Sequence, residues 1–349
     1  MCSSDLRALG TVPVEPDGSA YFEAPSDRQL FFVALDERDW AVKRMQSWCN
    51  VRPGEVLGCV GCHEPRTRAP ANRKAPGLEA MGRGPSRIEP FEGFPDVLDF
   101  TRDIQPILDR HCVSCHGYER REGGVILAGG LGPEWSHSYF TLFARRLVAD
   151  GRNGLGNQPP RSIGSSASRL LRLAEDGHYD AKVSPREWRT LWLWIETGAP
   201  YAGTYAALRN EAQQAAASSA PGRVFAEGLE VARQRCYTCH KPPSGREDPM
   251  ELPFYPSAER MNRAKASRST AVYERIVRDN DPMARLSPHI LINFTRPEHS
   301  PLLLGPLAKA AGGFGSCGEV FRDTLDPDYP RLLDANRCSR EGPEAHHCV

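Results

Sequence analysis

Apolar and polar residues alternate over the first part of the chain. The segment "TVPVEPDGSAYFEAP" alternates on both sides of Asp17-Gly18, and "QLFFVALDERDWAVKRM" repeats the plan around "DERD". Alternation with a period of two on either side of a short turn is typical of β-hairpins. We therefore expect residues 7–58 to form a β-rich domain, a small β-sandwich or part of one.

Further along the chain, apolar residues recur at helical spacing. The segment "DVLDFTRDIQPILDRHC" places four of them on one face of a helix that Pro106 is expected to bend, namely Phe100, Ile104, Ile107 and Leu108. Start and stop signals at Ser184-Pro185 and Gly198 bound a second helix, "SPREWRTLWLWIETGAP". The same pattern predicts helices in "SASRLLRLAEDG", "RVFAEGLEVARQRC", "STAVYERIVRDN", "SPLLLGPLAKAAGG" and "DPDYPRLLDANR".

Between these elements lie segments without periodicity. Residues 64–96 are rich in Pro, Arg and Gly, which predicts a linker or an extended wrapping segment, and "NEAQQAAASSAPG" is small and polar. We expect a multidomain protein in which mainly α domains with much irregular loop follow the β-sandwich-like region. The predicted order after residue 58 is a motif-bearing extended segment (59–96), an α domain (97–209), a linker (210–222), a second α domain (223–335) and an unassigned tail (336–349).

One five-residue pattern, Cys-x-x-Cys-His, occurs three times in the chain. It reads "CVGCH" at residues 59–63, "CVSCH" at 112–116 and "CYTCH" at 236–240. A random order of the same composition would contain about 0.01 copies. The pattern therefore reflects a chemical requirement.

Covalent attachment of a c-type haem needs this pattern. Two thiols add to the two vinyl groups of the porphyrin, and the adjacent imidazole binds the iron. We therefore predict three covalently bound haem c groups, and we expect the two α domains, which carry the second and third motifs, to be cytochrome c-type domains. The predicted thioether anchors are Cys59, Cys62, Cys112, Cys115, Cys236 and Cys239, and the predicted proximal iron ligands are His63, His116 and His240.

Three other interpretations compete with haem. A zinc site would pair each Cys-x-x-Cys with further ligands to make sets of four, which three identical motifs do not provide. A thioredoxin-like redox pair would need a βαβ setting, which the pattern of elements lacks. Free or disulfide-bonded cysteines would explain neither the spacing nor the histidine.

The sixth iron ligand decides what each haem can do. A His or Met there makes an electron carrier, whereas an open position allows a small molecule to bind and react. His178, in "EDGHYD" between two predicted helices, is a candidate distal ligand for the second haem, and His289 is a candidate for the third. A surface or core role is the alternative for both. The remaining candidates are Met250, Met261 and Met283 for the third haem, and His137 and His299; the first haem has no distal histidine in its neighbourhood.

Composition narrows the class of partner. Lys plus Arg and Asp plus Glu both number 44, so zero net charge gives no electrostatic case for binding nucleic acid or an anionic membrane. The sequence contains no apolar run near the roughly 18 residues of a membrane span. Outside the motifs, Cys49 and Cys317 are interpreted as buried thiols, with a disulfide or metal ligand as the alternative.

The N-terminal sequence bears on location. "MCSSDLRALGTVPV" lacks the sections of a signal peptide, so we expect a mature form or a piece of a longer chain. Because c-type haems are attached outside the bacterial cytoplasm, we expect a periplasmic or otherwise extracytoplasmic protein.

Several segments together resemble the C-terminal, haem-bearing half of hydrazine synthase alpha-subunit-like multihaem cytochromes c. They are "GTVPVEPDGSAYFEAP", "PGEVLGCVGCHEPR", "FTRDIQPILDRHCVSCHG", "SASRLLRLAEDGH" and "NFTRPEHSPLLLGPLAKAAGG", and the likeness runs from about Arg7 to Asp334. In that family a β-propeller usually precedes this region, so the resemblance implies a missing N-terminal domain or partner subunits.

The resemblance also implies roles for two of the haems. In the hydrazine-forming enzyme the middle-domain haem is catalytic and the next haem passes electrons. By motif order, these two haems correspond to the haem at Cys59 and the haem at Cys112 in this chain. That enzyme uses a Tyr as iron ligand four residues after the motif His, and Thr67 stands at this position here. The departure removes the most specific catalytic feature.

We therefore expect a multihaem c-type cytochrome that passes electrons between redox donor and acceptor proteins. The alternative is a haem oxidoreductase whose open first haem acts on a small nitrogen or oxygen species, as in hydrazine synthase.

Overall fold

The computed structural model describes residues 6–45, 48–59, 77–132, 135–149, 159–204, 223–240 and 292–341, without the side chains of 223–226, 229, 237–240 and 338–341. The strands are β1 (Val33–Leu35) and β2 (Ala41–Arg44). The α-helices are α1 (Gln105–His111), α2 (Val113–His116), α3 (His137–Ala144), α4 (Arg169–Asp176), α5 (Pro185–Glu196), α7 (Arg223–His240), α11 (Pro301–Leu304) and α12 (Asp328–Glu341). A π-helical turn covers Phe100–Ile104, and 3-10 turns cover Glu79–Gly82, Glu122–Gly124, Ser165–Ala167, Pro297–His299 and Lys309–Ala311.

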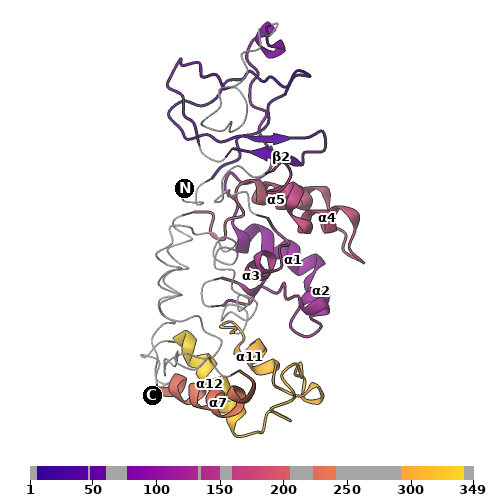
Figure 1. The fold of residues 1–349 in the computed structure, drawn as a ribbon, viewed down its shortest axis with the longest axis vertical. Helices are drawn as coiled ribbons and strands as arrows, with labels where there is room; N and C mark the ends of the chain where they lie inside the picture. Colours follow the sequence, from indigo (N-terminus) through magenta and orange to yellow (C-terminus); the bar gives the residue numbers. More distant parts are fainter. Residues whose placement is uncertain are drawn as a thin grey trace.

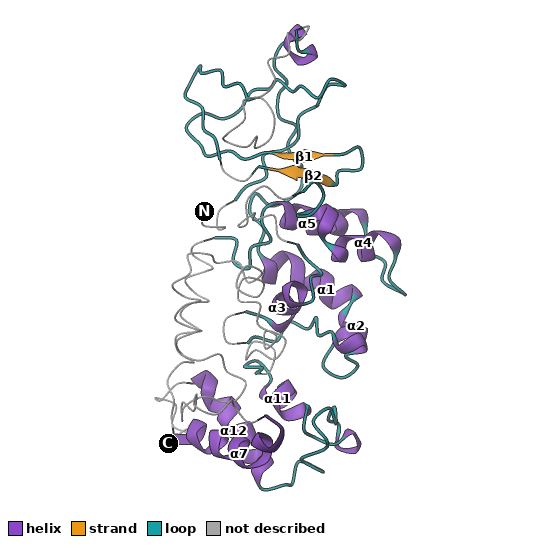
Figure 2. Ribbon diagram, in the orientation of Figure 1, coloured by secondary structure: helices purple, strands orange, loops and turns teal. Residues whose placement is uncertain are grey.

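The described elements follow one another along a long axis (Figures 1 and 2). The loops around β1 and β2 lie at one end, helices α1 to α5 occupy the middle, and α7, α11 and α12 lie at the other end. We refer to the last two groups as the central unit (residues 97–204) and the C-terminal unit (223–240 and 292–341).

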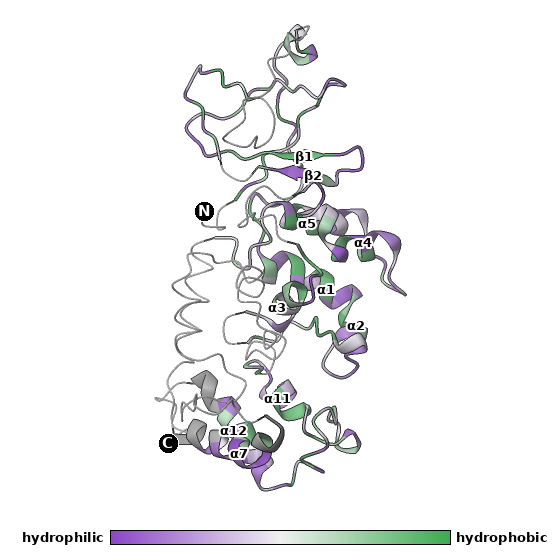
Figure 3. Cartoon of the chain, viewed as in Figure 1, coloured by the Kyte–Doolittle hydropathy of each residue, from purple (hydrophilic) through white to green (hydrophobic). Residues whose placement is uncertain are grey.

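The second predicted hairpin forms. Strands β1 and β2 pair antiparallel, and Asp36 begins the turn by accepting hydrogen bonds from the backbone N–H groups of Arg38 and Trp40. Figure 3 shows apolar residues on β1, whereas β2 carries both apolar and polar residues.

The first predicted hairpin forms its turn but not its strand pairing. The N–H of Gly18 donates to the carbonyl of Glu15, yet Thr11 bridges to Glu89 and Phe22 to Ser86. The flanks contain Pro13 and Pro16, which have no N–H to donate to a ladder. In the described part of the chain, the β-structure is one two-stranded sheet with isolated bridges, and the β-sandwich stays a prediction.

The helix before the second motif has the predicted apolar face. Phe100, Ile104, Ile107 and Leu108 are all buried. Asp99 caps the start by accepting from the N–H groups of Thr101 and Arg102. Near Pro106, where a bend was expected, a π-helical turn changes to α1. Pro106 lies in the first turn of α1, where a backbone N–H has no partner within the helix, so its absence costs nothing.

Helix α3 was not predicted from the sequence. Its residues from His137 to Phe143 are all buried. A short helix that is buried on every side shows no contrast between apolar and polar faces, so its sequence carries no helical period. Ser136 provides the N-cap by accepting from the N–H of Tyr139.

Helices α7 and α12 form the C-terminal unit around a second apolar cluster. Val231, Leu303, Phe321 and Leu332 are at its centre. Helix α12 runs to Glu341 and so crosses the boundary expected after residue 335. The predicted linker at 210–222 and the predicted helix at 269–280 lie outside the described residues. In the parts of the chain that are described, no helix has the length and apolarity needed to span a membrane.

Close packing of α7 on α12 predicts the effect of a single added methyl group. A Cβ at Gly228 would lie 2.4 Å from the Cβ of Ala335. Helical propensity favours alanine over glycine by about 1 kcal/mol, but overpacking costs about 1–3 kcal/mol. We expect Gly228→Ala to lower the free energy of unfolding by about 1 kcal/mol in urea denaturation. Gly82→Ala, where the added Cβ meets nothing within 4 Å, is the control; equal stability of both variants would contradict the prediction.

Candidate functional site

The structure describes the three Cys-x-x-Cys-His motifs to different extents. For the first, Cys59 is an exposed free thiol, while Cys62 and His63 lie outside the described residues. For the third, Cys236 is half-buried on α7, while Cys239 and His240 belong to that helix without described side chains. The second motif is described in full.

The second motif lies at the junction of two helices. Cys112 ends α1 and precedes α2, and His116 is the last residue of α2. The N–H of His116 donates to the carbonyl of Cys112 over 2.9 Å. Cys112 and Cys115 are half-buried free thiols. One tight turn therefore holds both thiols and the imidazole of the motif.

A backbone carbonyl orients the ring of His116. Its Nδ1 lies 3.0 Å from the carbonyl oxygen of Glu122. Because a carbonyl oxygen can only accept, Nδ1 donates this hydrogen bond, and Nε2 is the ring nitrogen left to bind a metal. This is the arrangement in which a histidine binds a metal, since the second nitrogen is fixed by a hydrogen bond.

The ring of His178 lies near that of His116 and nearly parallel to it, as a stacked pair. The two ring centres are 6.1 Å apart and the ring planes differ by 14°. Two imidazoles that bind one metal ion from opposite sides, with bonds of about 2.0–2.1 Å, have ring centres about 6.3 Å apart. Tertiary structure thus brings together two of the histidines singled out from the sequence, at a spacing that suits one metal ion between them.

The ligand set at this site fits a haem better than a bare metal ion. In the described part of the chain, no group of three or more His, Cys, Asp and Glu side chains is placed to hold a metal. Structural zinc needs four protein ligands, whereas a porphyrin supplies four nitrogens of its own and needs only two axial side chains. His116 and His178 would provide those two, and Cys112 and Cys115 would anchor the vinyl groups.

The thiol chemistry disfavours a redox-active cysteine pair. Burial, followed by the charges of Asp109 and Cys115, raises the pKa of Cys112 to about 11. This thiol is therefore protonated at neutral pH, unlike the thiolates of disulfide oxidoreductases.

A carboxylate links the motif helix to the helix that follows His178. Glu187 accepts from the backbone N–H and the hydroxyl of Ser184 over 2.9 and 2.7 Å, and lies 3.1 Å from Nε2 of His111. It also accepts from Arg110. Burial opposes ionisation of Glu187, but the Ser184 and His111 hydrogen bonds outweigh it and lower the pKa to about 2.

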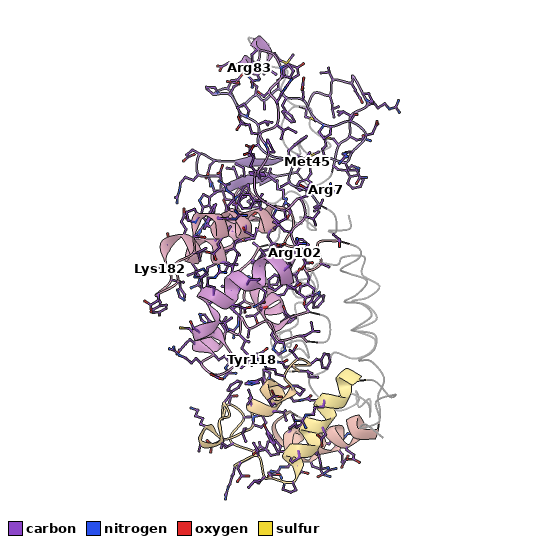
Figure 4. The ribbon with its side chains drawn as sticks, turned by 180° about the vertical axis from the view of Figure 1, so that it is seen from behind. Arg7, Met45, Arg83, Arg102, Tyr118 and Lys182 are labelled. Carbon is purple, nitrogen blue, oxygen red and sulfur yellow. The ribbon has the colours of Figure 1, made fainter. Side chains whose placement is uncertain are left out.

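Two of the other candidate ligands contact Tyr118, which Figure 4 shows where the central unit meets the C-terminal unit. His137 is fully buried, with Nδ1 2.9 Å from the Tyr118 hydroxyl and Nε2 2.6 Å from the carbonyl of Ile292, so neither nitrogen is free for iron. His299 packs its ring against Tyr118 at 5.4 Å. The remaining candidates, His289 and the three methionines, lie outside the described residues.

The sequence analysis missed the groups that orient this site. The "SPRE" segment carries a capping-box pattern that singles out Glu187 as the partner of Ser184. The carbonyl of Glu122 has no sequence signal, because any residue carries one. Outside the motifs, Cys49 and Cys317 are free thiols, with Cys49 half-buried and Cys317 exposed.

Two comparisons with known proteins find similarity to the alpha subunit of hydrazine synthase. Residues 3–64 match the family model of the hydrazine synthase alpha subunit middle domain. Hydrazine synthase subunit alpha of Kuenenia stuttgartiensis is 27% identical over a region that covers 35% of this chain and 21% of that protein. The chain therefore spans about a fifth of the length of this curated relative. No solved structure matches.

The lowered pKa of Glu187 predicts how its contribution to stability depends on pH. We expect Glu187→Gln to lower the free energy of unfolding by about 2 kcal/mol at pH 7, since hydrogen bonds to a charged group are lost. A carboxylate with a lowered pKa stabilises the fold above its unfolded value of 4.5, and this contribution is lost as the pH falls toward 2. In urea denaturation, the difference from the wild type should therefore narrow from pH 7 to pH 3.

Glu175→Gln provides the matched control. Glu175 pairs with Arg38, whose side chain is 63% exposed, so its loss should cost less than about 1 kcal/mol. If the difference in free energy of unfolding between the wild type and Glu187→Gln stays constant from pH 7 to pH 3, the prediction is wrong.

Proposed function

We propose that this chain is the haem-carrying part of a hydrazine synthase alpha-like protein and that its second motif holds a six-coordinate haem c that relays electrons. The observation that carries the proposal is the facing pair of His116 and His178, with their ring centres 6.1 Å apart. The comparisons support the hydrazine synthase-like part, because the family model matches residues 3–64.

A haem bound at the second motif would supply a one-electron iron couple. Within this proposal, Cys112 and Cys115 hold it covalently, and the carbonyl of Glu122 keeps Nε2 of His116 aimed at the iron. His178 fills the position at which a small molecule would otherwise bind. Electron transfer needs no substrate pocket, and the half-buried thiols and imidazoles suit a haem with one edge near the surface.

The proposal extends to the first and third motifs and to partners. The same residue pattern gives three covalent haems in all, attached outside the cytoplasm, with redox proteins as donor and acceptor. Because the similar protein from Kuenenia stuttgartiensis is named as a subunit, we include partner subunits in the proposal.

A second function, catalysis at the first motif, is favoured by one observation. The family-model match to a hydrazine synthase middle domain contains Cys59, Cys62 and His63 and ends before the second motif. The sequence near the first motif offers no distal histidine, so this hypothesis assigns an open iron position and a small nitrogen or oxygen species as substrate. Thr67, which stands where the hydrazine-forming enzyme has a tyrosine iron ligand, argues against hydrazine chemistry itself.

Removing His178 should open the second haem. We expect the His178→Ala holoprotein, exported with c-type haem maturation machinery, to keep the wild-type number of covalent haems by intact mass. One haem per chain should change from low spin to high spin in electron paramagnetic resonance, because its sixth ligand is lost. Lys182→Ala, at an exposed residue of the same loop, should leave the spectrum unchanged. A colourless wild-type protein, or an unchanged spectrum in His178→Ala, would refute the proposal.

Carbon monoxide binding separates the two functions. If the first haem is open, the reduced wild-type holoprotein should bind about one equivalent of carbon monoxide rapidly, whereas closed haems bind none rapidly. His178→Ala should then bind one equivalent more than the wild type. No rapid binding by the wild type would leave electron transfer as the function and eliminate catalysis at the first motif.

A further inference from the structure

We infer that Glu187 is a positioning residue that holds the His178 loop (residues 177–184) against the motif helix and so maintains the spacing between His116 and His178. This inference rests on the proposed function of the second motif. Glu187 touches neither histidine, and it acts through the two chain segments that carry them.

The His178 loop is held at both ends and has some contacts of its own. It begins after α4 at Gly177, in a left-handed conformation with φ +77°, and it ends at Ser184, the N-cap of α5. Tyr179 is 91% exposed, and its ring centre lies 4.6 Å from that of His178. Val183, the residue before Ser184, is half-buried against the apolar cluster of the central unit. The contacts that fix this loop to the rest of the central unit therefore lie at its downstream end.

One side chain connects the downstream end of this loop to the motif. Oε2 of Glu187 accepts both hydrogen bonds from Ser184 and lies 3.1 Å from Nε2 of His111. Oε1 accepts from Arg110. Because Arg110 and His111 directly precede Cys112, a single carboxylate joins the end of the loop to the start of the Cys112–His116 turn.

The electrostatic setting strengthens this connection. Glu187 lies in the first turn of α5, where the helix dipole favours a negative charge, and Arg110 and His111 lie in the last turn of α1, where it favours positive charge. The Glu187 side chain is only 14% exposed, so water competes weakly for its hydrogen bonds. The carboxylate therefore adds electrostatic stabilisation to the start of α5 and to the end of α1 when it lies between them.

The upstream end of the loop supplies a matched comparison. Glu175, near the end of α4, binds Arg38 over 2.7 Å in the turn between β1 and β2. This ion pair has the same chemistry and lies near the same loop, but it does not reach the motif helix. Loss of Glu175 should therefore disturb α4 without changing the distance between the two histidines.

The test compares Glu187→Ala, Glu187→Gln and Glu175→Ala as holoproteins with the wild type. We expect both Glu187 variants to keep their covalent haems. A fraction of the second haem should be high spin and bind carbon monoxide, and this fraction should rise about tenfold over the wild type, which is a typical coupling between linked sites. Glu175→Ala should match the wild type. Thermal unfolding of each variant separates loss of positioning from loss of folding.

Each outcome decides a different point. If the Glu187 variants lose thermal stability but keep the wild-type spin state and carbon monoxide reactivity, the residue is only structural and the inference fails. An equal change in Glu175→Ala would also overturn it. Should Glu187→Ala not yield holoprotein, Glu187→Gln, which retains the size and one acceptor oxygen, provides the measurement. A wild-type second haem without two histidine ligands would refute the proposed function itself.

Discussion

The arrangement of the central unit depends on the burial of one aromatic ring, Phe100. Its ring centre lies 5.0 Å from that of Tyr139, 5.4 Å from Trp194 and 5.8 Å from Tyr201. These rings come from the start of the motif helix, from α3, from α5 and from the segment after α5. Buried aromatic side chains contribute large apolar areas, and edge-to-face contacts give their packing a defined geometry. Phe100 thus fixes the motif helix relative to the helix that follows His178.

The polar ends of these rings are also satisfied. Trp194 Nε1 donates to the carbonyl of Pro200, and the Tyr139 hydroxyl donates to the carbonyl of Ala199. A buried donor without a partner would cost about 1–3 kcal/mol, so these bonds hold the segment after α5 in place. Outside this apolar cluster, Glu187 of α5 bonds to Arg110 and His111 at the end of α1. Aromatic packing and these polar contacts therefore act together to fix the motif helix relative to α5.

A second buried connection joins the central unit to the C-terminal unit. Because the carbonyl of Ile292 only accepts, His137 donates from Nε2 and its Nδ1 accepts from the Tyr118 hydroxyl. Burial raises the pKa of Tyr118, which keeps this hydroxyl protonated and able to donate. The two units also exchange backbone contacts, since the N–H of Phe294 donates to the carbonyl of Leu131. Tyr118 lies just after His116, so the second motif is close to both connections.

The sequence by itself determined the local features of this protein. The apolar spacing around Phe100 predicted the motif helix, and the Ser184 signal predicted the start of α5; the three repeated motifs predict haem attachment, which stays a prediction. These features were predictable because helix periods, caps and Cys-x-x-Cys-His spacing involve neighbours in the chain. Tertiary structure decided the rest. It paired His116 with His178, placed the carbonyl of Glu122 on the ring of His116, buried α3 on every side and directed the strands around Asp17 to residues 86–89. Each of these depends on contacts between distant segments, and no local pattern encodes which distant segment a side chain will meet.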